Sequence, residues 1–406
     1  MTLDKEWTFL IKDVFIVAAT RTPVGKLGGA LKNVLPEELT THVIRRVLEK
    51  ANLDVTSVDE VIFGQTKQSA DCPNVARVAA LIAGIPEETP AYTVHRQCSS
   101  GMQAAVCGAQ QIQTGDAEIV LCGGVESMST APYYLRNARY GFGAGNGLLL
   151  DPNTESQPRS QPSDRYGELI MGMTAETLAE RYDISREAQD AFAYESQMKA
   201  IAAIDSGRFS REIAPLVINQ KKNDIVFETD EFPRRDTSPV KLAGLRPAFK
   251  QGGTVTAGNS SGRNDGAAAM ILASKEALTR YDLQPLARIV SYAAAGVDPR
   301  VMGTGPVPST RKALEKCGLR LDQIGLIEIN EAFAAQTLAC VKELEIDRKR
   351  LNVNGGAIAL GHPLGMSGAR IITTLVHEMT LRDERYGLAS ICVAGGLGMA
   401  MICEKA

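Results

Sequence analysis

The sequence predicts an α/β fold built from two similar halves, and three observations support this prediction. First, apolar strand-like runs alternate with helical segments along most of the chain. Second, a pattern of a helix followed by a strand and a glycine pair occurs in the first half and again near the C-terminus. Third, 406 residues with 44% hydrophobic and 22% charged content suffice for two or three lobes around a core.

The elements of the first half are expected from their apolar periodicity and length. A continuous apolar run such as DVFIVAAT is typical of a buried strand, whereas PEELTTHVIRRVLEKANL has the spacing of a helix. Alternation of this kind predicts parallel strands joined by crossover helices. The expected elements, in order, are strand 13–20, helix 36–53, strand 58–66, helix 74–85, strand 91–94, a helix after Cys98 and strand 117–124.

The internal repeat links the region after Cys98 to the last part of the chain. In the first copy Ser100-Gly101 opens a helix, and a strand then leads to Gly123-Gly124. In the second copy Ser367-Gly368 stands at the helix start, and the following strand leads to Gly395-Gly396. Two equivalent halves would place their functional loops at equivalent ends of their sheets.

Residues 130–250, between the two halves, differ from them in sequence pattern. They contain the turn-forming stretch 151–164, helices expected at 174–182 and 186–207, and the stretch 233–250 with five basic residues and one acidic residue. Long irregular segments in compact enzymes are usually functional. We therefore expect 130–250 to be an inserted lobe that handles the substrate.

Charge and cysteine content narrow the class of protein. A formal net charge of −3 gives no reason to expect nucleic acid or an anionic membrane surface as a partner. Neither a secretory signal nor an apolar run of about 18 residues is recognisable in the sequence. None of the eight cysteines forms a CxxC motif. We expect free thiols in a reducing cytoplasm, with neither a disulfide framework nor a metal site.

Cys98 is the first candidate catalytic residue. The positive end of a helix and its free N–H groups favour a thiolate, which is the nucleophilic form of cysteine. The small residues Ser99, Ser100 and Gly101 would let a substrate approach the sulfur. A buried structural cysteine is the alternative, and Cys98 taken alone leaves both interpretations open.

A nucleophilic cysteine needs a base, and His362 is the best placed of four histidines. It lies between glycine and proline in NVNGGAIALGHPLGMSG, and Pro363 disfavours a helix at His362. His42 and His377 fall in helical runs where a surface or packing role is expected. His95, three residues before Cys98, could be a base or could brace the loop.

Three further segments are candidates for the same site. Asn330, at a strand-to-helix turn in IEINEAFAAQ, could position a water or an oxyanion donor, or could simply cap the helix. The small-residue run 252–269 suits a ligand that lies against the backbone, or a tightly packed sheet. Cys392 ends a strand at the place equivalent to Cys122 in the first copy of the repeat, where a buried structural thiol is the default.

Together these segments resemble the thiolase family over essentially the whole chain. The second half is especially similar to the biosynthetic-type branch that handles acetoacetyl-CoA. The matching pieces, in chain order, are Cys98 in CSSGM, TAGNSSG (256–262), NEAF (330–333), GHP (361–363) and Cys392 in CVAGG.

The resemblance implies a thiolase-like fold with duplicated βαβαβ halves in a five-layered αβαβα core. The N-terminal half would comprise residues 1–129 and 251–279, and the C-terminal half residues 280–406. The segment 130–250 would be an inserted loop lobe that binds coenzyme A.

The resemblance also implies a two-step acyl transfer between 3-ketoacyl-CoA, CoA and acetyl-CoA. Cys98 would carry the acyl group as a thioester, and His362 would accept its proton and hold the substrate thioester oxygen. Asn330 would hold a water in that first oxyanion hole, and Cys392 would move a proton on and off Cα of acetyl-CoA. The N–H groups of Cys98 and Ala394 would form the second oxyanion hole.

For coenzyme A, the resemblance implies a substrate and not a cofactor. Arg234 is expected near its phosphates, Ser261 near the pantetheine, and Met171 and Met302 near the acyl end. Phe333 is expected to bind the substrate or coenzyme A. A homodimer or homotetramer is implied by the resemblance only.

Three departures from the family pattern concern the site. His95 stands where many relatives have asparagine, and Ile170 stands where some acetoacetyl-type members have histidine. Ala394 stands where glycine is frequent, and alanine is tolerated there only if φ is negative. Competing functions are a longer-chain 3-ketoacyl-CoA thiolase of β-oxidation, a decarboxylating ketoacyl synthase, and a non-catalytic thiolase-like subunit. A synthase would not need Cys392, because decarboxylation generates its carbanion.

Overall fold

The computed structural model describes residues 12–219 and 224–406. The first eleven residues of the predicted N-terminal half, and residues 220–223 of the predicted inserted lobe, lie outside the described residues. Within the described ranges, no helix has the length and apolar character needed to cross a membrane.

The strands of the two halves join into one extended sheet with the order β12-β13-β14-β11-β1-β10-β5-β3-β4. The join is narrow, because β1 and β11 pair only at Phe15–Arg288 and Ile16–Ala287. The strands of this sheet are β1 Val14–Arg21, β2 Gly25–Lys26 (paired with β10), β3 Glu60–Gly64, β4 Ala91–Val94, β5 Ile119–Ser127, β10 Asn264–Ser274, β11 Ala287–Gly296, β12 Leu326–Ile329, β13 Tyr386–Val393 and β14 Leu397–Lys405.

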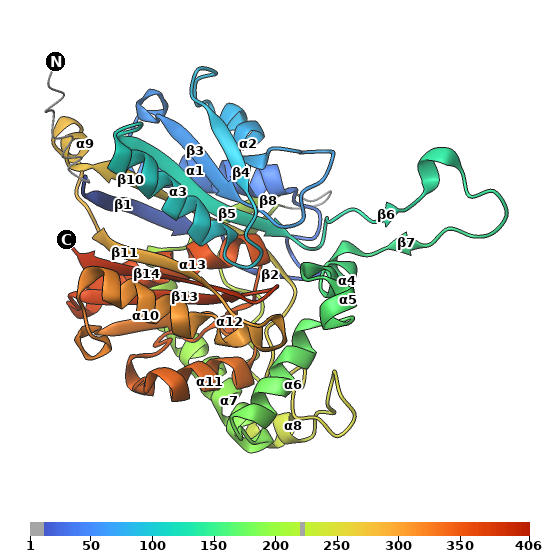
Figure 1. Ribbon diagram of the computed structural model, residues 1–406. Coiled ribbons are helices and arrows are strands. Elements are labelled where there is room, and N and C mark those ends of the chain that lie inside the picture. The colour runs from blue at the N-terminus through green and yellow to red at the C-terminus, as the bar shows by residue number, and fades with distance from the viewer. Residues whose placement is uncertain (1–11, 220–223) are drawn as a thin grey trace, which may run out of the picture.

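Helices cover both halves and fill the space between them (Figure 1). Helices α1 and α2 pack on the outer side of the N-terminal strands, and α10 packs on the outer side of the C-terminal strands. Between the halves, α3 and α13 pack against each other; α3 packs on strands of the N-terminal half, whereas α13 packs on strands of both halves. The result is the predicted five-layered αβαβα core. These helices are α1 Pro36–Ala51, α2 Val75–Ala83, α3 Ser100–Thr114, α10 Pro306–Cys317 and α13 Leu364–Arg382.

The prediction of parallel strands is only partly right. Strand β3 is parallel to β4 and β5, and β12 is parallel to β13. The remaining pairs are antiparallel, including β1–β10, β5–β10, β11–β14 and β13–β14. The reason is clearest for β13 and β14, because the turn at 394–396 is too short for the crossover that parallel pairing requires.

The two copies of the sequence repeat contact each other closely in the middle helical layer. A Cβ on Gly101 of α3 would lie 2.8 Å from the backbone nitrogen of Ala369 on α13. A Cβ on Gly368 of α13 would lie 2.5 Å from the backbone nitrogen of Met102 on α3. The equivalent Ser-Gly pairs therefore let the two helices approach each other reciprocally. This contact brings the starts of the helices together, and with them Cys98 and His362.

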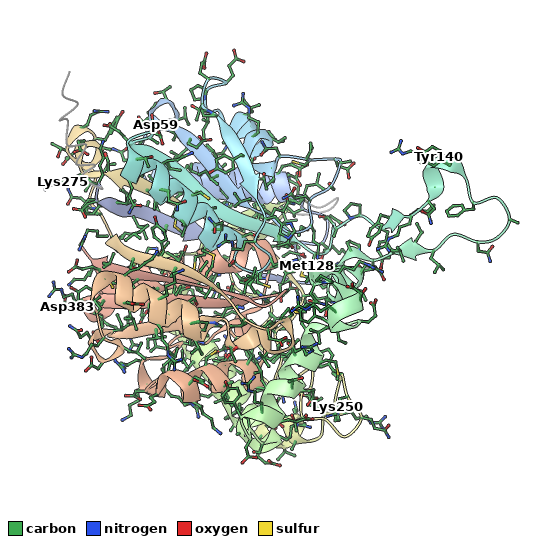
Figure 2. The ribbon with its side chains drawn as sticks, in the orientation of Figure 1. Asp59, Met128, Tyr140, Lys250, Lys275 and Asp383 are labelled. Atoms are coloured by element: carbon green, nitrogen blue, oxygen red, sulfur yellow. The ribbon has the colours of Figure 1, made fainter. Side chains whose placement is uncertain are left out.

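The segment between the halves contains an arm and several helices. The paired strands β6 and β7 extend away from the body, and Tyr140, which is 94% exposed, lies at the far end of this arm (Figures 1 and 2). Helix α6 packs against α11, and α7 packs against α11 and α12. The division of the chain at 129, 250 and 279 stays a prediction.

The remaining elements are short or belong to this segment and its contacts. They are β6 Tyr134–Leu135, β7 Leu149–Leu150, β8 Leu216–Ile218, β9 Ile225–Phe227, α4 Pro152–Glu155, α5 Ser163–Tyr166, α6 Met171–Arg181, α7 Arg186–Asp205, α8 Pro239–Ala243, α9 Lys275–Arg280, α11 Ala334–Leu344 and α12 Ala357–Leu360.

Candidate active site

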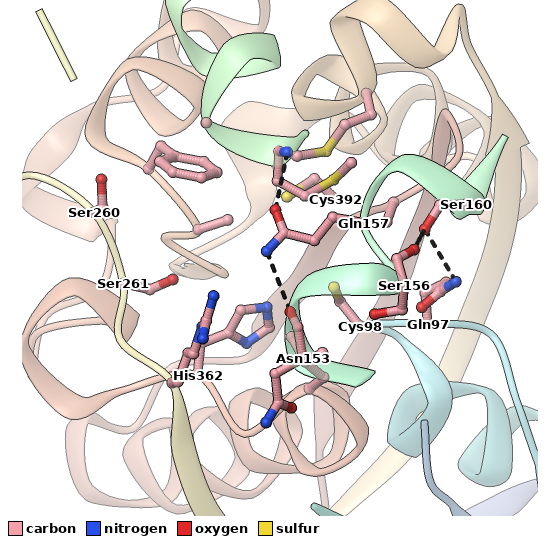
Figure 3. A pocket seen from close by; sticks show the side chains of 18 of the residues that line it. Gln97, Cys98, Asn153, Ser156, Gln157, Ser160, Ser260, Ser261, His362 and Cys392 are labelled. Atoms are coloured by element: carbon pink, nitrogen blue, oxygen red, sulfur yellow. Dashed lines mark hydrogen bonds between the residues drawn. The ribbon is translucent and has the colours of Figure 1, made fainter. Parts of the chain in front are cut away.

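One cavity of about 200 Å³ brings together the two sulfurs and the imidazole that the sequence motifs single out. Cys98 precedes α3, His362 lies in the loop between α12 and α13, and Cys392 lies on β13. Figure 3 shows these three side chains around the same space. The convergence expected from the sequence is therefore present in the structure.

The backbone around Cys98 forms a tight turn before the helix. Gln97 has a φ of 45°, which is unusual for a residue with a side chain. The Ser100 hydroxyl donates a 2.6 Å hydrogen bond to the Gln97 carbonyl, and the Ser99 hydroxyl donates a 3.0 Å hydrogen bond to the Arg96 carbonyl. Because α3 begins at Ser100, Cys98 lies at the positive end of the helix, as predicted.

Burial has a larger effect on the pKa of the Cys98 thiol than the N-terminal end of the helix has. Burial raises its pKa to about 11. The N–H of Ala394, the ammonium of Lys67 and the N–H of Cys98 act in the opposite direction, in decreasing order of effect. The N–H groups do favour the thiolate, as expected, but they do not outweigh desolvation. The resting thiol is therefore protonated at neutral pH and needs a base when it attacks.

His362 is held as a neutral base. Its Nδ1 lies 2.6 Å from the Ser367 hydroxyl, which donates its own proton to the Pro363 carbonyl at 2.9 Å. The hydroxyl must then accept from Nδ1–H, which leaves Nε2 without a proton. Asn330 Nδ2 lies 3.5 Å from Nε2 and donates to it. Burial, with a smaller contribution from Arg370, lowers the imidazole pKa to about 3.

We expect acylation of Cys98 to be insensitive to pH between about 5.5 and 8. A lowered pKa keeps His362 in its basic form down to about pH 4, whereas an ordinary imidazole would lose about 90% of that form by pH 5.5. Single-turnover acylation by acetyl-CoA, measured by rapid quench across this range, tests the expectation. A tenfold fall centred near pH 6.5 would show that His362 titrates normally.

Asn330 and Cys392 complete the inner part of the site. Asn330 directly follows β12 and is fully buried, and its Oδ1 has no hydrogen-bond partner among the described residues. Cys392 is 1% exposed, and burial raises its pKa well above the usual value, with Cys98 as the next contributor. Both thiols therefore rest in their protonated forms, and Cys98 adds to the rise in the pKa of Cys392.

Four of the five residues expected to contact the substrate line the cavity. Met171, Met302 and Phe333 form part of its apolar wall, and Ser261 lies near His362. Arg234 is exposed, lies over the ring of Phe232 and is not among the lining residues, so its role near the phosphates stays a prediction. Arg263, which sequence reasoning did not single out, does line the cavity.

Sequence reasoning also missed a polar wall beside Cys98. Ser156 and Ser160 lie on the same side of Cys98 as the amide of Gln97 (Figure 3). Most of these residues fall in the stretch 151–164, whose composition indicates turns and carries no sign of a binding wall. The polar residues of this wall are Gln97, Asn153, Ser156, Gln157 and Ser160.

The three departures from the family pattern have different outcomes. Ala394 is not among the residues with positive φ, whereas Gly395 and Gly396 are, so the condition for alanine there is met. His95 is exposed and is not among the lining residues, and its effect on the nucleophile loop stays a prediction. Ile170 precedes α6 and does not line the cavity, whereas Met171 does.

Comparison with known proteins identifies the family. The chain matches the thiolase N-terminal domain over residues 14–276 and the thiolase C-terminal domain over residues 283–405. It is 52% identical to an acetyl-CoA acetyltransferase of Pseudomonas aeruginosa, over 97% of this chain and 100% of that protein.

Solved structures show the same similarity. The crystal structure of the Bacillus anthracis acetyl-CoA acetyltransferase has a TM-score of 0.95 and 48% identity, covering 98% of this chain and 99% of that one. Human mitochondrial 3-ketoacyl-CoA thiolase in complex with CoA has a TM-score of 0.93 and 46% identity, with the same coverage of both chains. With matched domains over nearly the whole chain and the motif residues gathered in one cavity, this protein belongs to the thiolase family.

Proposed function

We propose that this protein is a thiolase that cleaves 3-ketoacyl-CoA with CoA into acetyl-CoA and a shortened acyl-CoA, and catalyses the reverse condensation. We also propose that acetoacetyl-CoA is the preferred 3-ketoacyl-CoA. The observation that carries the proposal is the meeting of Cys98, His362 and Cys392 in one cavity. Coenzyme A takes part as a substrate. By family resemblance, we also propose a cytoplasmic homodimer or homotetramer.

In the cleavage direction, the Cys98 sulfur attacks the C3 carbonyl while its proton passes to Nε2 of His362. The C2–C3 bond then breaks, leaving an acyl group on Cys98 and an enolate of acetyl-CoA that takes a proton from Cys392. The thiol of CoA next gives its proton to the Cys392 thiolate and attacks the acyl-cysteine, and His362 returns its proton to the Cys98 sulfur as that sulfur leaves. This sequence gives each thiol one task, covalent bonding for Cys98 and proton transfer for Cys392.

Two groups of hydrogen-bond donors would stabilise the oxyanions of these steps. The N–H groups of Cys98 and Ala394 both act on the Cys98 sulfur, which supports their role toward the oxygen of an acyl group bound there. On the other side, His362 Nε2, once protonated, would donate to the CoA thioester oxygen. The buried Oδ1 of Asn330 is the kind of group that holds a water beside it.

A longer-chain 3-ketoacyl-CoA thiolase is the second candidate. The relatives include 3-ketoacyl-CoA thiolases as well as acetyl-CoA acetyltransferases. The apolar wall of Met171, Phe249, Met302 and Phe333 could accept an alkyl group. A decarboxylating synthase has less support, because Cys392 lies at the site where a proton acceptor is needed.

Steady-state thiolysis across chain length tests the proposed function. With CoA as the second substrate, we expect kcat/KM to be highest for acetoacetyl-CoA and to fall by about tenfold or more for 3-oxooctanoyl-CoA. Formation of acetyl-CoA, followed by chromatography, measures both reactions. Faster cleavage of the longer substrate would favour the second candidate, and no cleavage of any 3-ketoacyl-CoA would refute thiolase function.

A further inference from the structure

The walls of the catalytic cavity differ in polarity. The cavity is lined by the apolar side chains of Met171, Phe249, Met302 and Phe333, and also by five side chains that carry hydroxyl or amide groups. The polar wall is internally connected, since Gln97 Nε2 donates to Ser160 Oγ at 3.3 Å and Ser160 Oγ donates to the Ser156 carbonyl at 2.9 Å. An unsubstituted alkyl chain placed against this wall would desolvate polar groups without offering them partners.

A lysine ammonium lies directly behind this wall. Lys67 is 9% exposed, and its Nζ donates a 2.6 Å hydrogen bond to Ser156 Oγ. Among the described residues, this is the one hydrogen bond of the ammonium, and no carboxylate lies within 4.0 Å of it. An ammonium has three N–H donors, so two have no protein partner here. Burying a cation whose N–H groups lack partners costs free energy unless an anion pairs with it.

The position of Lys67 is held by its backbone and not by an ion pair. Its N–H donates to Glu126 Oε1 at 2.9 Å. Burial lowers the pKa of Lys67, and Glu126 opposes this lowering, but its carboxylate binds the main chain and leaves the ammonium without an ion pair. Glu126 Oε2 accepts from the N–H of Gly365 at 2.9 Å, close to His362 in the chain. The loop that carries Lys67 is thereby tied to the catalytic loop.

Ser156 connects the ammonium to the catalytic cavity. Its hydroxyl accepts from Lys67, and its own proton has no acceptor among the described residues. Ser156 lines the catalytic cavity, and together with Lys67 it also lines a neighbouring cavity of about 510 Å³. Ser156 therefore stands between the space around Cys98 and the neighbouring cavity, and Lys67 lies on the side of that neighbouring cavity.

We propose that Lys67 and Ser156 bind a carboxylate at the far end of the acyl group, so that 3-ketoacyl-CoA substrates with an ω-carboxylate are preferred over unsubstituted ones of the same length. The carboxylate would accept from the Ser156 hydroxyl and from the free N–H groups of Lys67, forming charge-assisted hydrogen bonds. The reaction is unchanged, and the acyl group left on Cys98 carries the carboxylate. This inference rests on the proposed thiolase function.

The competing role for Lys67 is electrostatic support of Cys98, whose pKa the ammonium lowers. The two roles differ in what they do to substrate choice. Support of the nucleophile would affect every acyl group equally, whereas a carboxylate site would affect only substrates that carry one. The informative quantity is therefore the ratio of kcat/KM between paired substrates.

The test compares 3-oxohexanedioyl-CoA with 3-oxohexanoyl-CoA, and the eight-carbon pair likewise, in the full-length protein. For the wild type we expect the carboxylated member of at least one pair to have the higher kcat/KM. In Lys67→Met this ratio should fall at least tenfold, and in Ser156→Ala it should fall by a smaller factor. The matched control is Lys275→Met, an exposed lysine remote from the cavity, whose ratio should equal that of the wild type (Figure 2).

Three results would overturn the inference. These are a wild-type ratio below one for both pairs, an unchanged ratio in Lys67→Met, or an equal loss for both members of a pair. If the variants do not fold, inhibition of the wild type decides, because hexanedioyl-CoA should then bind more tightly than hexanoyl-CoA. Cleavage of acetoacetyl-CoA without a preference for carboxylated substrates would reject this inference alone. Absence of all cleavage would reject the proposed function.

Discussion

Replacement of Cys98 by alanine is expected to abolish the acyl-enzyme and to lower the rate of thiolysis by about 10⁴-fold or more. Among the described residues that line the cavity, Cys98 is the thiol placed for the covalent step, because the N–H groups of Ala394 and Cys98 converge on its sulfur. Cys392 also lines the cavity, but burial raises its pKa well above the usual value, and among the described residues its own N–H is the group that opposes this rise.

Mass spectrometry after incubation with acetyl-CoA measures this effect. The wild type should show one acetyl group on the peptide that contains Cys98, and Cys98→Ala should show none. Cys317→Ala is the matched control, since this half-buried cysteine at the end of α10 lies outside the cavity and should leave the adduct unchanged. An adduct that appears only on another cysteine would refute the assignment of Cys98.

Replacement of Cys392 by serine is expected to separate the two chemical steps. Acylation of Cys98 should persist, because Cys98 and His362 remain in place. Exchange of the α-protons of acetyl-CoA should fall by about 10³-fold, within the range that a positioned general acid or base contributes. A serine hydroxyl is a far weaker acid than a thiol, and the burial that already raises the pKa of Cys392 would raise that of a hydroxyl further.

Deuterium incorporation into acetyl-CoA in heavy water, followed by mass spectrometry, measures the exchange, and acetyl-adduct formation is measured in parallel. Cys317→Ser serves as the control and should exchange as fast as the wild type. Wild-type exchange in Cys392→Ser would remove Cys392 from proton transfer. Loss of both exchange and acylation would instead indicate that the variant has disturbed the whole cavity.

Much of the fold could be predicted from local patterns in the sequence. Apolar runs and helical periodicity located β1, α1, β3 and α3 to within a few residues, because burial on one or both faces imposes those patterns. Strand direction could not be predicted in the same way. The antiparallel pairing of β10 with β1 and β5 depends on how the chain returns to the sheet after a long insertion, and no residue pattern within β10 records this.

The residues of the candidate site could likewise be predicted only in part from the sequence. Cys98, His362, Asn330 and Cys392 could be named from the sequence because their motifs are short and chemically distinctive. The wall that faces the acyl group could not, because Ser156 lies in a turn-rich stretch and Lys67 is separated from it by 89 residues. Serine and lysine are common in loops, and only the tertiary structure shows that these two residues are in contact beside Cys98.

The sequence by itself determined which residues are available for acyl transfer, and the order of strands and helices that carries them. The tertiary structure alone decided the protonation states, because burial raises the Cys98 pKa and lowers the His362 pKa against what their local neighbours suggest. It also decided which polar groups border the substrate. The physical reason is that a helix end or a local hydrogen bond shifts a pKa through residues close in the sequence. Desolvation shifts a pKa through the packing of segments that are far apart in the chain, and the same packing decides which residues line a cavity.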